Sequence, residues 1–153
     1  MKIEDEIKSK FKNDYHKLVV NIHLTSARVG EQMENEMKKY GITMTQYNVL
    51  RILRGQNQKP VSVGLIKERM IERNSDVSRI IDRLVKKNLI QRTENQKDRR
   101  QKDVLISDEG LRVLAELDSF EDLIEKKLGH LSKKEVKTLN ELLDKVRSTK
   151  DLQ

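Results

Sequence analysis

The sequence predicts a mainly α-helical protein that carries one small β-hairpin. Its 153 residues include only one proline and six glycines, so few positions would interrupt a helix. Apolar residues recur every three or four positions through most of the chain, which is the spacing of amphipathic helices. Two short segments, 89–94 and 102–107, instead have the character of β-strands, and they flank a polar stretch that includes NQKDRR.

The first forty residues predict one long amphipathic helix. Apolar side chains recur at helical spacing from Ile3 onward without a proline, and the helix is expected to end near Tyr40 with Gly41 as its stop. The next helix is expected to begin after Thr43, because Thr43 and Gln46 have the spacing of a capping box.

The segment after the polar connector 55–60 predicts a short strand position followed by a short helix. Val61 is expected to add a single β-rung and Ser62 to cap the helix VGLIKERM. Gly64 lies inside that helix, where glycine is unfavourable, so we expect it to admit a close neighbour. Asn74 is the expected N-cap of the following helix and Asn88 its left-handed end.

Two longer helices are expected after the hairpin. Ser107 is the expected cap of the first, which has apolar positions from Leu111 to Leu128. Ser132 and Glu135 form a second capping-box pattern that opens the last helix.

The helix expected at about 75–87 has one apolar and one cationic face. Its apolar positions, which fall into one stripe at 3.6 residues per turn, are Val77, Ile80, Ile81, Leu84 and Val85. The residues that point away from this stripe are Ser75, Arg79, Asp82 and Lys86, with Ser78 and Arg83 at its flanks. A helix held by one apolar face while it presents serines and cations on the other fits the major groove of duplex DNA.

The basic excess of the chain is concentrated around this helix. Lys and Arg outnumber Asp and Glu by 15 to 7 in residues 41–107, whereas the counts are 8 and 7 in residues 1–40 and 9 and 11 in residues 108–153. A localised cationic patch is what phosphate binding requires. A merely solvated basic surface is the alternative interpretation of the high pI.

Composition argues against several other classes. Without cysteine, the chain can form no disulfide, thiolate nucleophile or Cys-ligated zinc site. Aromatic residues make up only 3%, which disfavours a base-stacking platform for single strands. The histidines, at positions 16, 23 and 130, lack metal-ligand spacing, so no metal or other cofactor is expected. No signal peptide or membrane span is visible, and a cytoplasmic protein that does not bind membranes is expected.

The sequence resembles the multiple-antibiotic-resistance regulator (MarR) family along essentially its whole length. The matching stretches are Thr43-Met-Thr-Gln-Tyr47, Val77-Ser-Arg-Ile-Ile-Asp-Arg-Leu84 with the residues up to Ile90, Asp98-Arg-Arg100, and Leu105-Ile-Ser-Asp-Glu-Gly110. The Asp-x-Arg wing signature, followed at the characteristic distance by Ser-x-x-Gly, is the specific part. Asn88 stands where the family commonly has glycine.

The resemblance implies a homodimeric transcription factor with a winged helix-turn-helix head. Residues 41–107 would form the DNA-binding head, with its recognition helix at about 75–87 and its wing at about 89–107. Residues 1–40 and 108–153 would form a helical dimerisation module. The two recognition helices would enter successive major grooves of a pseudo-palindromic operator. Arg100 would enter the minor groove from the wing, and Asp98 would pair with an arginine.

The candidate DNA-binding residues have distinct expected roles. Arg79 could read a guanine edge, although an intrahelical salt bridge to Asp76 or Asp82 is the alternative. Ser75 and Ser78 could reach bases or phosphates, or serve only as first-turn residues. The cations expected to position the protein on phosphates are Lys67, Arg83, Lys86, Lys97 and Arg99.

A ligand pocket is the second candidate site. The residues that could line it, between the terminal helices and the head, are Tyr15, His16, Tyr40 and Tyr47. For each of these side chains simple packing is the alternative. The resemblance implies small anionic aromatic effectors, including phenolic compounds, that weaken DNA binding.

The expected function is therefore that of a regulator that binds a specific double-stranded DNA sequence, acting as a repressor released by a small-molecule effector. The alternative is a helical interaction protein whose basic face meets RNA or an acidic protein. Catalysis is not expected, because neither a phosphate-cradling glycine loop nor a nucleophile with a partner base is visible.

Overall fold

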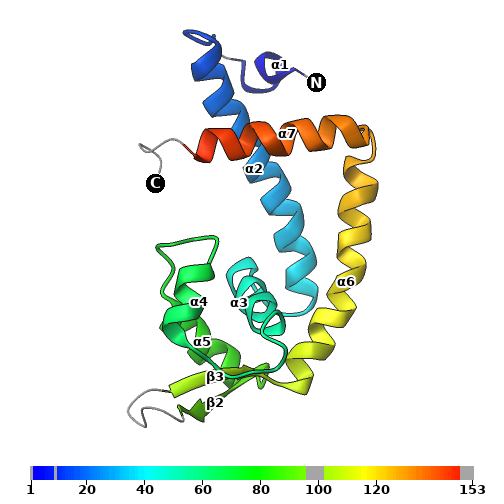
Figure 1. Cartoon of the computed structure of the whole chain (residues 1–153). Coiled ribbons are helices and arrows are strands. Elements are labelled where there is room, and N and C mark those ends of the chain that lie inside the picture. Colours follow the sequence, from blue (N-terminus) through cyan, green and yellow to red (C-terminus); the bar gives the residue numbers. More distant parts are fainter. Residues whose placement is uncertain (1, 9, 96–101, 149–153) are drawn as a thin grey trace. The chain divides into compact units, whose positions relative to one another are not determined.

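A computed structural model of the chain describes residues 2–8, 10–95 and 102–148. The fold is mainly helical with a small antiparallel sheet, as predicted (Figure 1). It forms two compact units, residues 1–114 and 115–153. In chain order the elements are α1 (Ile3–Ile7), α2 (Asp14–Lys39), α3 (Met44–Arg54), β1 (Val61–Ser62), α4 (Val63–Arg69), α5 (Val77–Lys86), β2 (Ile90–Glu94), β3 (Lys102–Ile106), α6 (Asp108–Leu128) and α7 (Lys133–Arg147).

The prediction of one continuous helix up to Tyr40 is wrong, because the chain breaks between α1 and α2. Lys8 adopts a left-handed conformation (φ 47°) at the end of α1. The side chain of Asn13 then caps α2 by accepting a hydrogen bond from the backbone N–H of His16 at 2.9 Å. Glu4 and Lys17 join the two helices through an ion pair of 2.6 Å. The end of α2 is as predicted, with Gly41 left-handed at φ 65°.

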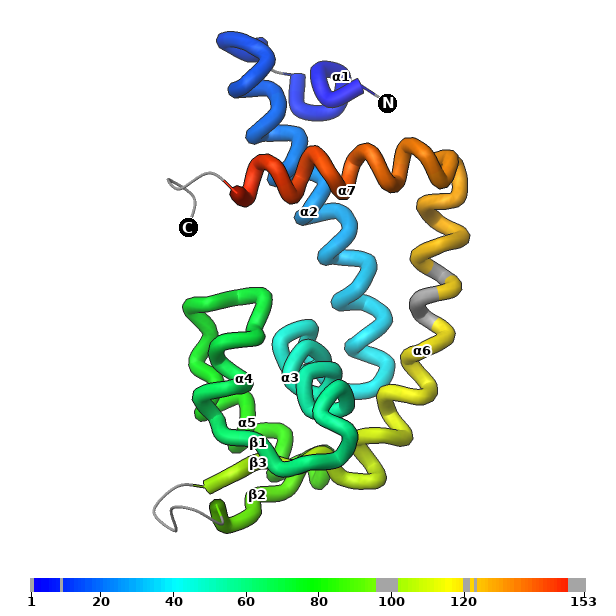
Figure 2. Tube along the Cα trace, viewed as in Figure 1, coloured from blue at the N-terminus to red at the C-terminus, as the bar shows by residue number. Residues whose placement is uncertain are grey.

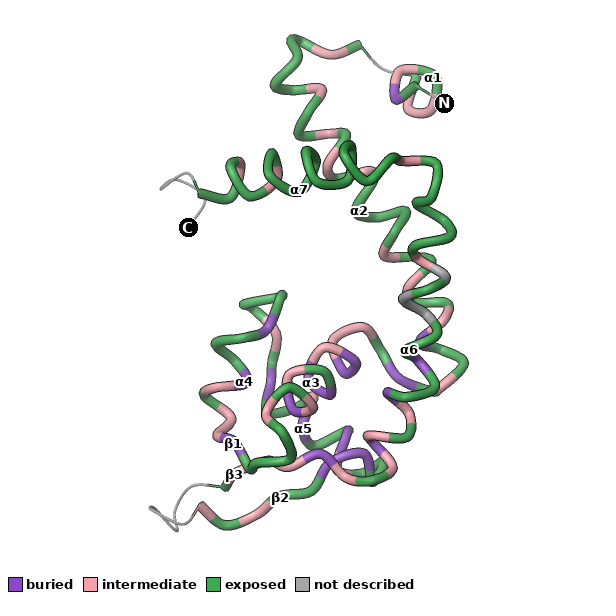
Figure 3. The backbone as a smooth tube through the Cα atoms, turned by 45° about the vertical axis from the view of Figure 1, so that its right-hand side comes forward, coloured by how far each residue is buried: buried purple, intermediate pink, exposed green. Residues whose placement is uncertain are grey.

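The head packs α3, α4 and α5 with a three-stranded sheet in the order β1-β3-β2 (Figure 2). The register pairs Val61 with Val104 and Ile90 with Ile106, so these four side chains share the buried face of the sheet. Burial is concentrated in the head and the adjoining start of α6 (Figure 3). Its most buried side chains are Val49, Leu50, Leu53, Ile66, Ile81, Leu84, Val104 and Leu114.

Most predicted helix ends are confirmed. Thr43 and Gln46 form the capping box of α3, and the Ser62 hydroxyl accepts a hydrogen bond from the N–H of Leu65 at 3.2 Å. Asn88 is left-handed at φ 58°. The N-cap of α5 was mispredicted, because Asp76 caps it instead of Asn74. The Asp76 carboxylate accepts a hydrogen bond from the N–H of Arg79 at 3.1 Å, and the helix therefore begins at Val77.

The close approach expected at Gly64 occurs elsewhere in the chain. A Cβ atom at Gly64 would meet only the Ser62 hydroxyl, at 3.7 Å, so that prediction is wrong. At Gly110, in the first turn of α6, a Cβ atom would lie 2.2 Å from the carbonyl oxygen of Leu89 and 2.8 Å from Cγ1 of Ile106. Glycine is therefore required where α6 crosses the start of the hairpin.

The second unit contains the rest of α6 and all of α7. The predicted capping box at Ser132 and Glu135 opens α7. No residue of α7 is buried in the single chain, and its apolar side chains at Val136, Leu139 and Leu142 are exposed. Such an apolar stripe is normally covered by another surface. No described helix has the length and apolarity to cross a membrane.

Ser132→Ala is expected to raise the pKa of Glu135 toward its ordinary value. The Ser132 hydroxyl and backbone N–H donate hydrogen bonds to the Glu135 carboxylate at 2.7 and 2.8 Å, and they lower its pKa. Because the folded pKa is below the unfolded one, this contribution to stability is complete above the unfolded pKa and is lost as the pH falls through the folded value. NMR titration of the Glu135 carboxyl group in both proteins measures the effect, and identical curves would contradict it.

Candidate nucleic-acid interface

Helix α5 has the two faces predicted from its sequence. Val77, Ile81 and Leu84 are buried against the head, and Ile80 and Val85 are half-buried beside them. The opposite face is exposed, and its members are Ser78, Arg79, Asp82, Arg83 and Lys86. The basic residues Arg83 and Lys86 also lie in the last turn, where cations interact favourably with the helix dipole.

Arg79 is available for an external partner. Asp76 uses its carboxylate on the backbone N–H of Arg79, and Asp82 pairs with Arg92 of β2. Among the described residues, the Arg79 guanidinium forms no ion pair with either carboxylate, so the expected alternative role is not adopted. The Asp82–Arg92 pair also attaches α5 to the sheet and places a cation beside the only acidic residue within α5.

The other candidate DNA-binding residues differ in their exposure and in their hydrogen bonds. Ser75 is half-buried in the turn before α5, and its hydroxyl donates to Glu72 at 3.3 Å. Ser78 is exposed. Lys67 is exposed on α4, where it lines a shallow pocket with Gly64, Glu68 and Arg73. The four wing candidates Lys97, Asp98, Arg99 and Arg100 lie outside the described residues.

Lys87 is a structural residue that the sequence analysis did not identify. Its ammonium group donates to the carbonyl oxygen of Gly41 and to the side-chain oxygen of Gln46, the latter at 3.4 Å. Gln46 is itself buried, with 3% of its surface exposed. Lys87 thus joins the end of α5 to the junction of α2 and α3. The sequence spacing could have indicated this contact, because Lys87 follows the buried Leu84 by three positions and therefore lies on the same side of the helix.

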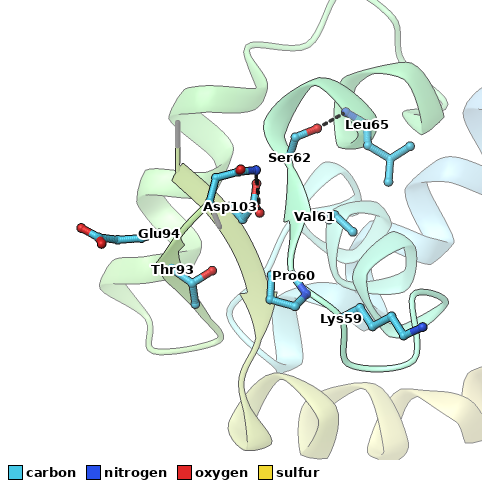
Figure 4. A pocket seen from close by; sticks show the side chains of 9 residues that line it. Lys59, Pro60, Val61, Ser62, Leu65, Thr93, Glu94 and Asp103 are labelled. Atoms are coloured by element: carbon cyan, nitrogen blue, oxygen red, sulfur yellow. Dashed lines mark hydrogen bonds between the residues drawn. The ribbon is translucent and has the colours of Figure 1, made fainter. Parts of the chain in front are cut away.

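A groove lies beside the sheet at the base of the wing (Figure 4). Ser62, Asp103 and Thr93 are register partners on neighbouring strands and form a polar row across the sheet. The Asn95 amide donates to both carboxylate oxygens of Asp103, at 3.1 and 3.0 Å. The Thr93 hydroxyl is buried without a hydrogen-bond partner in the described part of the chain. An unpaired buried hydroxyl is unfavourable for folding.

Thr93→Val is expected to increase the free energy of unfolding by up to about 1 kcal/mol, because it removes the unpaired hydroxyl and keeps the branched shape. Urea unfolding followed by circular dichroism measures the change. Thr93→Ser is the matched control, because it keeps the hydroxyl and loses the methyl group, and it should lower stability. A valine variant less stable than the native protein would show that the hydroxyl has a partner.

The four residues predicted for a ligand pocket are not gathered within one chain. Tyr15 and His16 lie in the first turn of α2, and 82% of the Tyr15 surface is exposed. Tyr40 caps the other end of that helix, roughly 37 Å away at 1.5 Å per residue, and Tyr47 is buried in α3. His16 accepts a hydrogen bond from the N–H of Lys12 and packs edge-on against Phe11. Within the described ranges, no three potential metal ligands come together.

Comparison with known proteins is consistent with this architecture. The model of the MarR family matches residues 42–102, which include α3 to β2 and the start of β3. The HTH-type transcriptional repressor MdtR of Bacillus subtilis (strain 168) is 42% identical over 83 residues, which are 54% of this chain and 52% of the repressor. The chain spans about half the length of the curated relatives it matches.

Solved structures share the fold over most of the chain. A mutant MarR from E. coli complexed with operator DNA superposes with a TM-score of 0.78 and 25% identity, covering 90% of this chain and 99% of that one. The organohalide sensing RdhR-CbdbA1625 transcriptional regulator, in its 2,4-dichlorophenol bound form, gives a TM-score of 0.80 at 18% identity, with 88% and 80% covered. The second likeness concerns the fold alone.

Proposed function

The MarR family model matches residues 42–102, and on this similarity to a family of transcriptional regulators we propose that the chain regulates transcription by binding a specific sequence of double-stranded DNA. The observation that carries the proposal is the exposed face of α5. It presents Arg79 without an ion pair among the described residues, on a helix held by a buried apolar stripe. Arg83 and Lys86 on the same face would contact phosphates and position the protein on the duplex. The family is one of regulators, not enzymes.

We further propose that the protein acts as a homodimer. Exposed apolar side chains on α2 and α7, in the two regions assigned to a dimerisation module, support this proposal. On α2 they are Tyr15, Leu18, Val19 and Val29, and on α7 they are Val136, Leu139 and Leu142. A second copy of the chain would cover these surfaces, and it would present a second α5 to the next major groove of a pseudo-palindromic operator.

The regulator is proposed to be a repressor that a small anionic aromatic compound releases from DNA. The similarity to the repressor MdtR supports repression over activation. Tyr15, His16, Tyr40 and Tyr47 remain the proposed contacts. Because Tyr15 and His16 lie in the first turn of α2, whereas Tyr40 caps its other end and Tyr47 lies in α3, a common pocket would need residues from both chains. The ligand would act by favouring a head separation that no longer matches adjacent grooves.

Selection of bound duplexes from a random pool tests the function. We expect a pseudo-palindromic consensus, bound by a dimer far more tightly than its scrambled counterpart, with affinity that decreases as salt increases. Binding of the selected duplex in the presence of phenolic acids tests the effector. Equal affinity for selected and scrambled duplexes at physiological salt would refute sequence-specific regulation and favour the interaction protein that uses its basic face on RNA or an acidic partner.

A further inference from the structure

One large apolar side chain is exposed on the head without a structural role there. Among the described residues from 41 to 107, Ile71 is the only large hydrophobic residue on the exposed surface, and 82% of its area is accessible. The other exposed large hydrophobics lie on α2, α6 and α7, where a second copy of the chain would cover them: Tyr15, Leu18, Val19, Val29, Leu128, Val136, Leu139 and Leu142.

The backbone holds Ile71 in a fixed orientation. The preceding residue, Met70, is extended (φ −62°, ψ 138°) and buried, with 5% of its surface exposed. The backbone N–H of Ile71 donates to the side-chain oxygen of Asn48 in α3 at 3.0 Å. Met70 is thus buried in the core and the next N–H is bonded to α3, and between these two contacts the side chain of Ile71 is directed outward.

Ile71 also lies in the turn that leads into α5. It is six positions before Val77, the first residue of that helix, and in a helix-turn-helix the start of this helix meets the base edges. Exposed cations flank it in the sequence at Lys67, Arg69 and Arg73. The exposed carboxylates of Glu68 and Glu72 alternate with these cations in the sequence. An exposed apolar side chain in this turn is suited to the one apolar group on the floor of the major groove, the C5 methyl of thymine.

We propose that Ile71 is a specificity-determining residue that contacts the methyl group of one thymine in each operator half-site. The inference rests on the proposed function and adds to it a base preference that is independent of hydrogen bonding. Burying one methyl group against Ile71 corresponds to roughly a four-fold change in affinity for each half-site.

The test replaces thymines of the selected duplex, one position of each half-site at a time, by deoxyuridine, which lacks only the methyl group. We expect the native protein to lose about four-fold in affinity per half-site at one thymine position. The Ile71→Ala variant should bind the thymine duplex more weakly by a similar factor, and it should not distinguish thymine from uracil at that position. Ile71→Val, which keeps a branched apolar side chain, should retain most of the discrimination.

Comparing the loss of affinity on replacing thymine by uracil between the native protein and Ile71→Ala separates a direct contact from a change in DNA stiffness. A change in stiffness would reduce the affinity of both proteins equally. Thermal unfolding of Ile71→Ala should match that of the native protein, since the side chain is exposed. Two outcomes would overturn this inference while leaving specific DNA binding intact. In one, the native protein binds the thymine and uracil duplexes equally well; in the other, Ile71→Ala loses as much affinity on replacement of thymine by uracil as the native protein does. A native protein that does not prefer its selected duplex to a scrambled one would instead overturn both proposals.

Discussion

Replacing Gly110 by alanine is expected to lower the free energy of unfolding by about 2–4 kcal/mol and the Tm by roughly 5–15 °C. The new Cβ atom would lie 2.2 Å from the Leu89 carbonyl oxygen, which is backbone and cannot rotate away as a flexible side chain could. The same carbonyl accepts a hydrogen bond from the N–H of Ser107 at 3.1 Å. Alanine would therefore force α6 away from the start of the hairpin and weaken the bond that joins them.

Gly64→Ala is the matched control for this experiment. Gly64 also lies in a helix, but its neighbour is a hydroxyl at the ordinary distance of 3.7 Å. Alanine there should leave stability unchanged or raise it by up to about 1 kcal/mol, since it favours the helical conformation. Urea unfolding of both variants gives the comparison. A Gly110→Ala protein as stable as Gly64→Ala would show that the hairpin tolerates displacement of α6.

Arg79→Ala is expected to weaken binding to the selected duplex by roughly 5- to 150-fold and to relax the preference at one base pair of each half-site. These factors correspond to the 1–3 kcal/mol of discrimination typical of a bidentate arginine–guanine contact. The expectation depends on the Arg79 guanidinium forming no ion pair with Asp82, which is instead paired with Arg92. Binding of duplexes that carry each base at that position, measured by fluorescence anisotropy, tests the change in preference.

Lys86→Ala provides the contrast on the same face of α5. If Lys86 contacts a phosphate, its loss should weaken binding to all sequences alike and reduce the slope of log affinity against log salt by about one unit per protomer. The pattern of base preference should remain that of the native protein. Indistinguishable effects of the two substitutions on base preference and on the salt slope would contradict the division between a base-reading arginine and a phosphate-binding lysine.

Local patterns predicted most of the fold because they involve neighbouring residues. The apolar spacing of α5 and the capping boxes of α3 and α7 bring together residues three or four positions apart, and all three predictions are confirmed. The break before α2 was missed because the apolar spacing continues through it, although Asn13 is a standard capping residue. The sequence predicts Asn74 as the cap of α5, although Asp76 is an equally good capping residue. The structure favours Asp76, the residue directly before the first helical position.

Features that depend on distant segments could not be read from the sequence. The restriction at Gly110 arises from Leu89 and Ile106, and nothing in the surrounding helix indicates that contact. The bond from Asn48 to the Ile71 backbone joins residues 23 positions apart. Ile71 belongs to no apolar stripe in the sequence, and its exposure is distinctive because the other large hydrophobic side chains described in the head are buried or half-buried.

The hydrogen bonds of Lys87 join one end of the long helix α2 to the end of α5. One ammonium group holds both the C-terminal end of α2 and the end of α5, because it binds Gly41 and Gln46. The 26 residues of α2 extend roughly 39 Å from the end that Lys87 binds. A displacement of about 3 Å at the distal end of α2 then corresponds to a tilt of only about 4° at the end bound by Lys87. A rotation of α5 that tilted α2 through such an angle would therefore move the distal end of α2 by about 3 Å.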